Sequence, residues 1–120
     1  MWNIQNTSDT MSIVRGDSET IDVRVIDKDK SSVDITGSTV FFTVKRLLKY
    51  PDSEAVIQIN QTAHADPANG FTKIILTSTD TEIIPDQYVY DLQIKFPNGD
   101  IRTTRRGIFQ ILTDITRRTS

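Results

Sequence analysis

The sequence contains no cysteine, only one histidine and no long run of apolar residues. The absence of cysteine excludes a disulfide framework, a thiolate zinc site and a cysteine nucleophile. A single histidine excludes the usual His-rich metal sites and argues against a Ser-His-Asp triad. No apolar run approaches the roughly 20 residues of a membrane-spanning helix. The N-terminus also lacks the basic start and apolar core of a signal peptide. We therefore expect no membrane partner.

What remains is the composition of one folded domain that carries no recognisable catalytic machinery. The 120 residues are 37% hydrophobic and 25% charged, and the net charge is −2. No glycine-rich phosphate loop, zinc signature or pair of catalytic carboxylates is present. His64 has no acid or serine at a spacing that would orient it as a base, and we expect it to be exposed. Lysines interleave the acids of residues 22–34, which favours a solvated turn over a calcium site. The sequence therefore predicts no enzyme, no cofactor and no metal.

Alternation of apolar and polar residues is the main structural signal. It runs through residues 21–25, 40–44 and 88–96, and such a period of two is typical of half-buried strands. Shorter candidates cover residues 56–59, 71–76 and 107–112. No window shows the 3.6-residue stripe of an amphipathic helix. Six or seven short strands at this spacing predict an all-β fold, either a sandwich or a small barrel.

Turn signals separate these runs. Gly16 lies in an Arg-Gly-Asp turn ahead of the first alternating run, and Asn98-Gly99 separates the last two. Tyr88 follows the turn residues 84–87 at the start of the longest run. It matches the tyrosine corner of immunoglobulin-like sandwiches, where the phenol binds the preceding backbone. An ordinary half-buried strand tyrosine explains it equally well.

Two further groups of residues are candidates for binding a partner. Residues 101–120 hold five arginines against one acid, a net charge of +4, so the first 100 residues carry −6. These arginines, above all Arg102, Arg105 and Arg106, either dock on an acidic surface or protect an edge strand from aggregation. The second group is apolar and is either an interface anchor or a cap on an open end of the sandwich: Trp2, Ile4, Leu47, Leu48 and Tyr50.

Several stretches, in order and spacing, resemble a family of tailed-bacteriophage virion proteins. Its best-known members are the N-terminal immunoglobulin-like domains of upper baseplate proteins. The resemblance covers roughly residues 13–118 and has no single specific motif. It lies in residues 15–18, 33–40, 42–46, 52–57, 90–95 and 98–99, Thr103-Thr104, Gly107 and residues 114–117.

The resemblance implies an immunoglobulin-like antiparallel β-sandwich of about seven strands. We expect an N-terminal arm at residues 1–12, the sandwich at 13–118 and a tail at 119–120. It also implies a structural component of the virion, made in the host cytoplasm, that binds other virion proteins of the capsid, neck or tail in many copies or as a homo-oligomer. Because no coiled coil or receptor-binding head follows the sandwich, an accessory tail, neck, baseplate or head-decoration protein is expected. The net negative charge argues against nucleic acid as a partner. The alternative is a carbohydrate- or cell-surface-adhesion module, with Tyr50 and Phe71 as an aromatic platform for a sugar.

Overall fold

The computed structural model describes residues 9–47 and 51–115, and the strands dominate this part of the chain. The strands are β1 (Asp9–Val14), β2 (Glu19–Arg24), β3 (Thr39–Lys45), β4 (Ile57–Gln61), β5 (Phe71–Leu76), β6 (Gln87–Lys95) and β7 (Ile101–Leu112). Two short 3-10 helices, Asp52–Glu54 and Pro67–Asn69, lie in the connections on either side of β4. In these described ranges no helix is long and apolar enough to cross a membrane.

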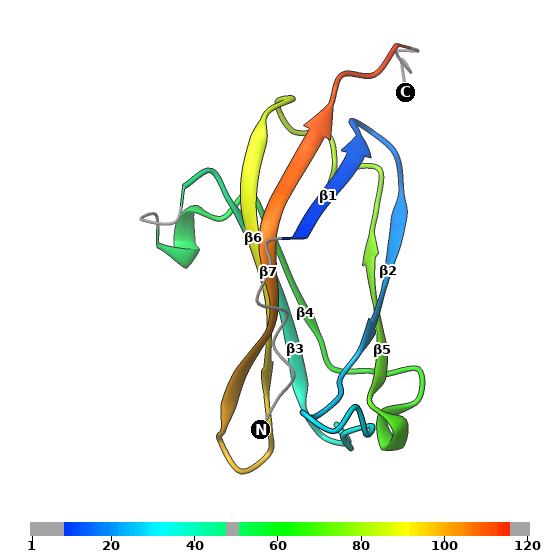
Figure 1. Cartoon of the computed structure of the whole chain (residues 1–120). Helices are drawn as coiled ribbons and strands as arrows, with labels where there is room; N and C mark the ends of the chain where they lie inside the picture. The colour runs from blue at the N-terminus through cyan, green and yellow to red at the C-terminus, as the bar shows by residue number, and fades with distance from the viewer. Residues whose placement is uncertain (1–8, 48–50, 116–120) are drawn as a thin grey trace.

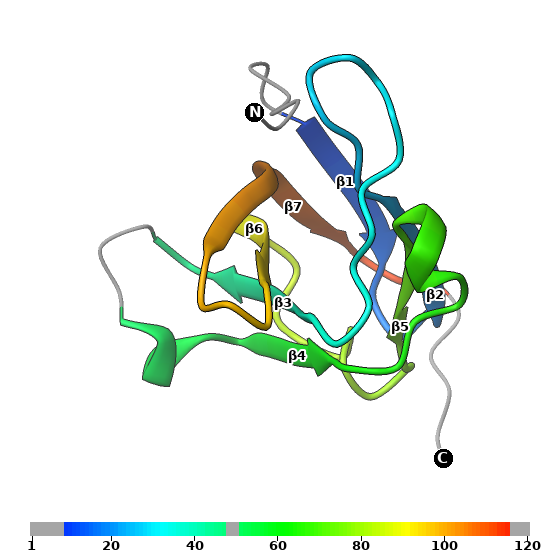
Figure 2. The same cartoon turned by 90° about the horizontal axis from the view of Figure 1, so that it is seen from below.

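The strands form two sheets packed face to face (Figure 1). One sheet has the order β1-β7-β6-β3-β4, and the other is the β2-β5 pair. The larger sheet curves, and the β2-β5 pair lies on its concave side (Figure 2). The second and fifth strands thus form one sheet, and the third, sixth and seventh are the central strands of the other. This is the strand distribution of the immunoglobulin fold, with an additional strand beside the third as in variable-type domains. The chain is an all-β, immunoglobulin-like sandwich.

β1 is the one strand that the alternation pattern did not predict. It pairs in parallel with β7, from Asp9 opposite Gly107 to Val14 opposite Leu112, whereas the other strand pairs are antiparallel. Residues 9–12, which were expected to belong to the N-terminal arm, are therefore part of the sheet. The rest of that arm, and the expected tail at residues 119–120, lie outside the described residues.

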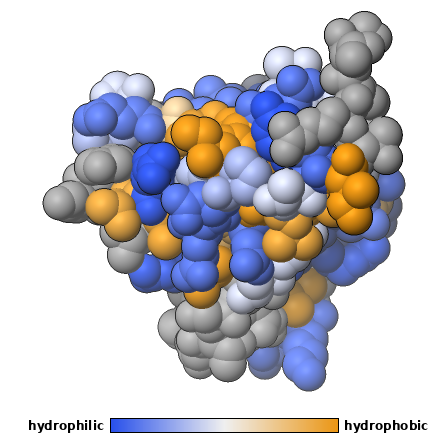
Figure 3. Space-filling model, turned by 90° about the horizontal axis from the view of Figure 1, so that it is seen from above, coloured by the Kyte–Doolittle hydropathy of each residue, from blue (hydrophilic) through white to orange (hydrophobic). Residues whose placement is uncertain are grey.

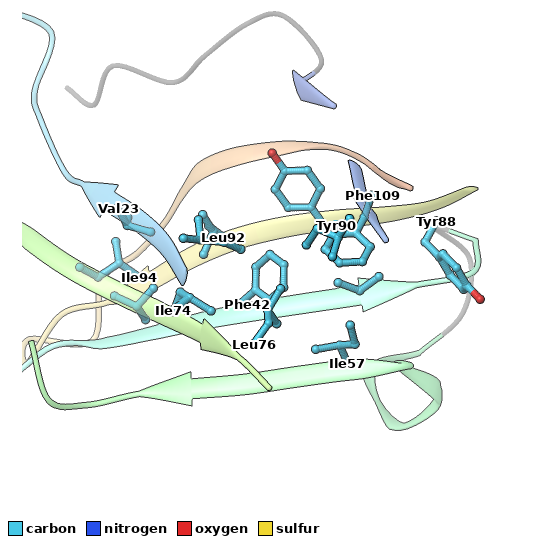
Figure 4. Close-up of a cluster of buried hydrophobic side chains, with 14 of the residues drawn as sticks. Val23, Phe42, Ile57, Ile74, Leu76, Tyr88, Tyr90, Leu92, Ile94 and Phe109 are labelled. Carbon is cyan, nitrogen blue, oxygen red and sulfur yellow. The ribbon is translucent and has the colours of Figure 1, made fainter. Parts of the chain in front are cut away.

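The core fills the space between the two sheets. Along β6, the side chains of Tyr88, Tyr90, Leu92 and Ile94 point inward and are buried. They meet Ile74 and other inward side chains of the smaller sheet (Figure 4). The alternating positions of β6 point to the opposite side of the sheet, as a period of two requires. The same strands therefore build the core with one side and a solvent-facing surface with the other.

The turn at Arg15-Gly16-Asp17 joins β1 to β2 and serves the fold. The Asp17 amide donates to the Val14 carbonyl oxygen at 3.0 Å, and Gly16 has a φ of +84°. A positive φ at the third position of a four-residue turn defines type II, in which glycine is favoured. The fully buried Thr81 hydroxyl donates to the Asp17 carbonyl oxygen at 2.7 Å and ties the turn to the β5-β6 connection. The tripeptide is thus a structural turn held at both ends.

Tyr88 lies at the start of β6 and connects that strand to the loop before it. Its hydroxyl donates to the Ile84 carbonyl oxygen at 2.5 Å, while the ring is almost fully buried. In Figure 4 the oxygen points away from the other labelled side chains. This is the bond that defines a tyrosine corner. Burial raises the pKa of the Tyr88 phenol, with a smaller opposing effect of Arg46 and a smaller raising effect of Asp86.

Replacing Tyr88 with phenylalanine should lower the free energy of unfolding by about 1–2 kcal/mol, because the Ile84 carbonyl loses its donor. The variant should also change how the free energy of unfolding depends on pH in the alkaline range. A raised pKa means that the folded state holds the phenol proton more tightly than the unfolded state. Wild-type stability should therefore fall as the pH rises above the ordinary phenol value of 10.0. Urea unfolding across this range measures both effects; equal alkaline slopes in the two proteins would contradict the second.

Candidate functional site

The outward side of the five-stranded sheet carries a groove with a volume of about 590 Å³. No other strand of the described chain packs on this side. We call this outward side of the five-stranded sheet the outer face. The residues that point onto it from β3, β4, β6 and β7 and line the groove are Phe41, Thr43, Lys45, Gln58, Val89, Asp91, Gln93, Lys95, Ile101, Thr103 and Arg106.

The strand register arranges these side chains in rows across the sheet. Lys45 lies opposite Val89, and two residues further along β6 Asp91 lies opposite Arg106. The last row places Lys95 opposite Ile101, which is 53% exposed. Residues directly opposite one another share a face and lie about 5 Å apart. The groove thus combines three cationic side chains and one carboxylate with both apolar and uncharged polar side chains.

The three arginines predicted as a basic ribbon on β7 are not on one side of the sheet. Arg106 points onto the outer face, opposite Asp91. Arg105 lies opposite Leu92, and Arg102 lies opposite Ile94, which places both on the inward side. Arg102 there lines a second cavity of about 390 Å³ with residues of the β6-β7 turn and with Val33.

The apolar residues predicted as interface anchors are only partly accounted for. Leu47 is 49% exposed and lies two residues beyond the end of β3. Its neighbour Arg46 donates to the Asp86 carboxylate at 3.3 Å, which fixes the start of this connection against the β5-β6 loop. The remaining anchors of that prediction, Trp2, Ile4, Leu48 and Tyr50, lie outside the described residues.

The end of the sandwich where β7 finishes exposes further apolar side chains. Ile84, Leu112 and Ile115 are 66%, 40% and 98% exposed. Figure 3 looks down on this end and shows apolar side chains in separate areas interrupted by hydrophilic ones. Scattered exposed apolar residues are normal on protein surfaces, and only large contiguous patches indicate docking. The outer face remains the stronger candidate.

The aromatic platform expected for a sugar is represented by Phe71 alone, since Tyr50 is not described. Phe71 lies on the outward side of the β2-β5 sheet. The Arg24 guanidinium carbon lies 5.0 Å from its ring centroid, and the Lys73 ammonium nitrogen lies 5.3 Å from it. Lys73 also pairs with Asp22 at 3.4 Å. Two cationic side chains thus lie close to the one described ring on which a sugar was expected to stack.

Two of the acids considered for metal binding, Asp27 and Asp34, accept hydrogen bonds within turns. Asp27 Oδ1 accepts the amides of Asp29 and Ser31 at 2.9 and 3.0 Å. Asp34 accepts the hydroxyl and the amide of Thr36 at 2.6 and 2.9 Å, and these two bonds lower the pKa of the Asp34 carboxyl. Within residues 9–47 and 51–115, no three His, Asp or Glu side chains come close enough to share a metal ion.

His64 is half-buried, so the prediction that it is exposed is wrong. One ring nitrogen, Nε2, lies 2.7 Å from the Ser38 carbonyl oxygen, which can only accept, so Nε2 carries the proton. In the neutral imidazole, Nδ1 then accepts a hydrogen bond from the hydroxyl of the buried Thr72 at 2.8 Å. The imidazole therefore joins the start of β3 to β5 across the two sheets. This structural role depends on contacts far apart in the sequence, which local spacing does not indicate.

Comparisons with known proteins add little to this description. No protein-family model matches the chain, and no curated protein sequence matches it. Among solved structures, a structure of murine CRIg aligns over 95% of this chain and 97% of that chain, with 9% sequence identity and a TM-score of 0.37. An alignment this loose carries no functional argument. The fold assignment stands on the strand order and the pairing described above.

Proposed function

We propose that this protein is a structural component of a tailed-phage virion and acts through protein–protein contacts made by its outer face. The observation that carries the proposal is the groove on that face, with apolar side chains exposed beside charged ones. Apolar residues next to a polar rim are the usual composition of a protein-binding surface. The resemblance of residues 13–118 to phage immunoglobulin-like domains supports the location in a virion.

In this proposal the sandwich is a rigid support and performs no chemistry. Its binding partners are other virion proteins of the capsid, neck or tail. Many copies on a symmetric particle would add weak contacts by avidity, so a single contact of modest affinity is sufficient. Mass spectrometry of purified particles of the encoding phage tests the location directly. We expect this chain at a fixed ratio to the major capsid protein, whereas recovery only from the soluble fraction of infected cells would contradict the proposal.

A pair of matched variants tests whether the outer face makes the contact. Ile101 on the outer face and Ile75 on the outward side of the β2-β5 sheet are exposed to similar extents, 53% and 58%. We expect Ile101→Asp to reduce incorporation into particles at least tenfold, because it places a charge in an apolar contact. Ile75→Asp should be incorporated normally. Circular dichroism confirms that both variants fold, and equal incorporation of the two would contradict the role of the outer face.

A further inference from the structure

We infer that the outer face binds an extended, acidic polypeptide segment of another protein, an inference that rests on the proposed role of this face as the contact surface. It specifies the chemistry of the partner, which the fold alone leaves open.

The outer face is positive in a protein that is negative overall. Among the described side chains that line the groove, Lys45, Lys95 and Arg106 are positive and Asp91 is negative, so this lining sums to +2, whereas the chain carries −2. Complementary charge accelerates encounter and selects partners, and like charges placed together oppose binding. Two copies of this chain meeting through their outer faces would bring two positive surfaces together. A symmetric contact between two outer faces is therefore unfavourable, and an acidic segment of a different protein complements the charge of this face.

The spacing of the rows matches an extended segment. The lysines mark the two ends of the groove, because Lys45 is opposite Val89 and Lys95 is six residues further along β6. Six residues of strand span about 20 Å, and successive rows are about 6.6 Å apart. In an extended segment, every second side chain points the same way with this same repeat. Two acidic residues six positions apart can thus reach both lysines.

The middle of the groove accepts apolar side chains of such a segment. Phe41 lies on the outer face between the rows of the two lysines, and Ile101 adds an exposed apolar side chain at one end. Arg106 lies in the row next to Lys45. The segment that fits carries an acid at each end and apolar residues at alternate positions between them.

Nucleic acid is the other polyanion that a basic groove could bind. Affinity for nucleic acid comes from many phosphate contacts, and this face offers three cations in a chain of pI near 5.3. The acidic polypeptide is the better fit. Binding of an oligonucleotide is therefore included among the measured outcomes.

The probe is a synthetic peptide with two glutamates six positions apart and leucines at alternate positions between them. Three comparison probes are the same peptide with lysine for glutamate, a version with the glutamates adjacent, and a thymidine oligonucleotide of similar length. Binding to the full chain is followed by amide chemical shifts in NMR spectra. We expect shifts at Thr43, Gln93 and Thr103, weakened by salt, and at least tenfold weaker binding of each comparison probe.

Charge reversal supplies the matched variants. Lys95→Glu with Arg106→Glu should weaken binding of the glutamate peptide at least tenfold. Lys28→Glu with Lys30→Glu makes the same change in net charge in the exposed turn after β2 and should leave binding unchanged. Absence of binding, shifts elsewhere on the molecule, equal binding by the two double variants, or tighter binding of the oligonucleotide would each overturn the inference. If Ile101→Asp still blocks incorporation in that case, the outer face remains the contact surface, with a partner of different chemistry.

Discussion

Replacing Gly70 with alanine is expected to lower the free energy of unfolding by about 2–5 kcal/mol. Two costs add. Gly70 has a φ of +73°, and this conformation costs a residue with a Cβ about 1–2 kcal/mol. An alanine Cβ would also lie 2.6 Å from the carbonyl oxygens of both Val25 and Val33. These are backbone atoms that cannot rotate away, and overpacking of this kind costs about 1–3 kcal/mol.

The clash is severe because three segments of the chain converge at Gly70. The Val25 amide donates to the Gly70 carbonyl oxygen at 2.8 Å, and the Val33 amide donates to the Val25 carbonyl oxygen at 3.0 Å. The Gly70 amide in turn donates to the Pro67 carbonyl oxygen at 3.0 Å. Moving any one of these segments to admit a methyl group stretches hydrogen bonds that hold the other two.

Gly99 provides the matched control for this prediction. Its φ is +95°, but a Cβ there would meet no atom within 4 Å. Gly99→Ala therefore incurs only the backbone cost, about 1–2 kcal/mol. Urea unfolding of the two variants separates the two contributions. Equal losses of stability in both would show that the convergence at Gly70 relaxes easily, contrary to the argument above.

Much of the fold follows from local alternation in the sequence. Residues 88–96 alternate strictly, and β6 occupies that run with its apolar side chains in the core. A side chain that points to the wrong side of a sheet is costly, so a period of two fixes which residues face inward. Turn chemistry adds the connections, as Asn98-Gly99 does between β6 and β7. These signals are local, which is why a sequence alone contains them.

Features that depend on which strands are neighbours could not be predicted in this way. Alternation placed Val89, Asp91, Gln93 and Lys95 together on one side of β6 but could not place β3 and β7 on either side of that strand. The groove exists only because Phe41 and Arg106 reach it from those two neighbours. The parallel pairing of β1 with β7 is likewise set by contacts between residues about 100 positions apart.

The arginines of β7 show how a single irregularity redirects side chains. The register between β6 and β7 shifts between Leu92 and Gln93, so that Thr104 is an extra residue in β7. A bulge of this kind reverses the alternation beyond it. Arg102 and Arg105, three positions apart, consequently share the inward side, while Arg106 is on the outer face. The three arginines therefore do not form one basic surface. Arg106 lies in the groove, and Arg102 and Arg105 lie on the other side of the sheet.

The proposed contact surface and the core share the same strands, so one substitution in the core should test how strongly they depend on each other. Phe42 lies at the middle of β3 and is fully buried. Its ring centroid lies 5.8 Å from that of Tyr90 and 6.0 Å from that of Phe109, the second in an edge-to-face arrangement. We expect Phe42→Ala to lower the free energy of unfolding by about 3–5 kcal/mol, because it leaves a cavity where three rings meet.

The neighbouring Phe41 is the control, since it points onto the outer face and is only half-buried. Phe41→Ala should change the free energy of unfolding by less than about 1 kcal/mol, the usual range for a surface substitution, yet weaken binding at the groove. Phe42→Ala should weaken binding only at temperatures or urea concentrations where the variant begins to unfold. Urea unfolding and peptide titration of both variants measure this separation. If Phe41→Ala lost as much stability as Phe42→Ala, the outward side of β3 would stabilise the fold as much as the inward side does. That result would contradict the separate roles inferred for the two sides.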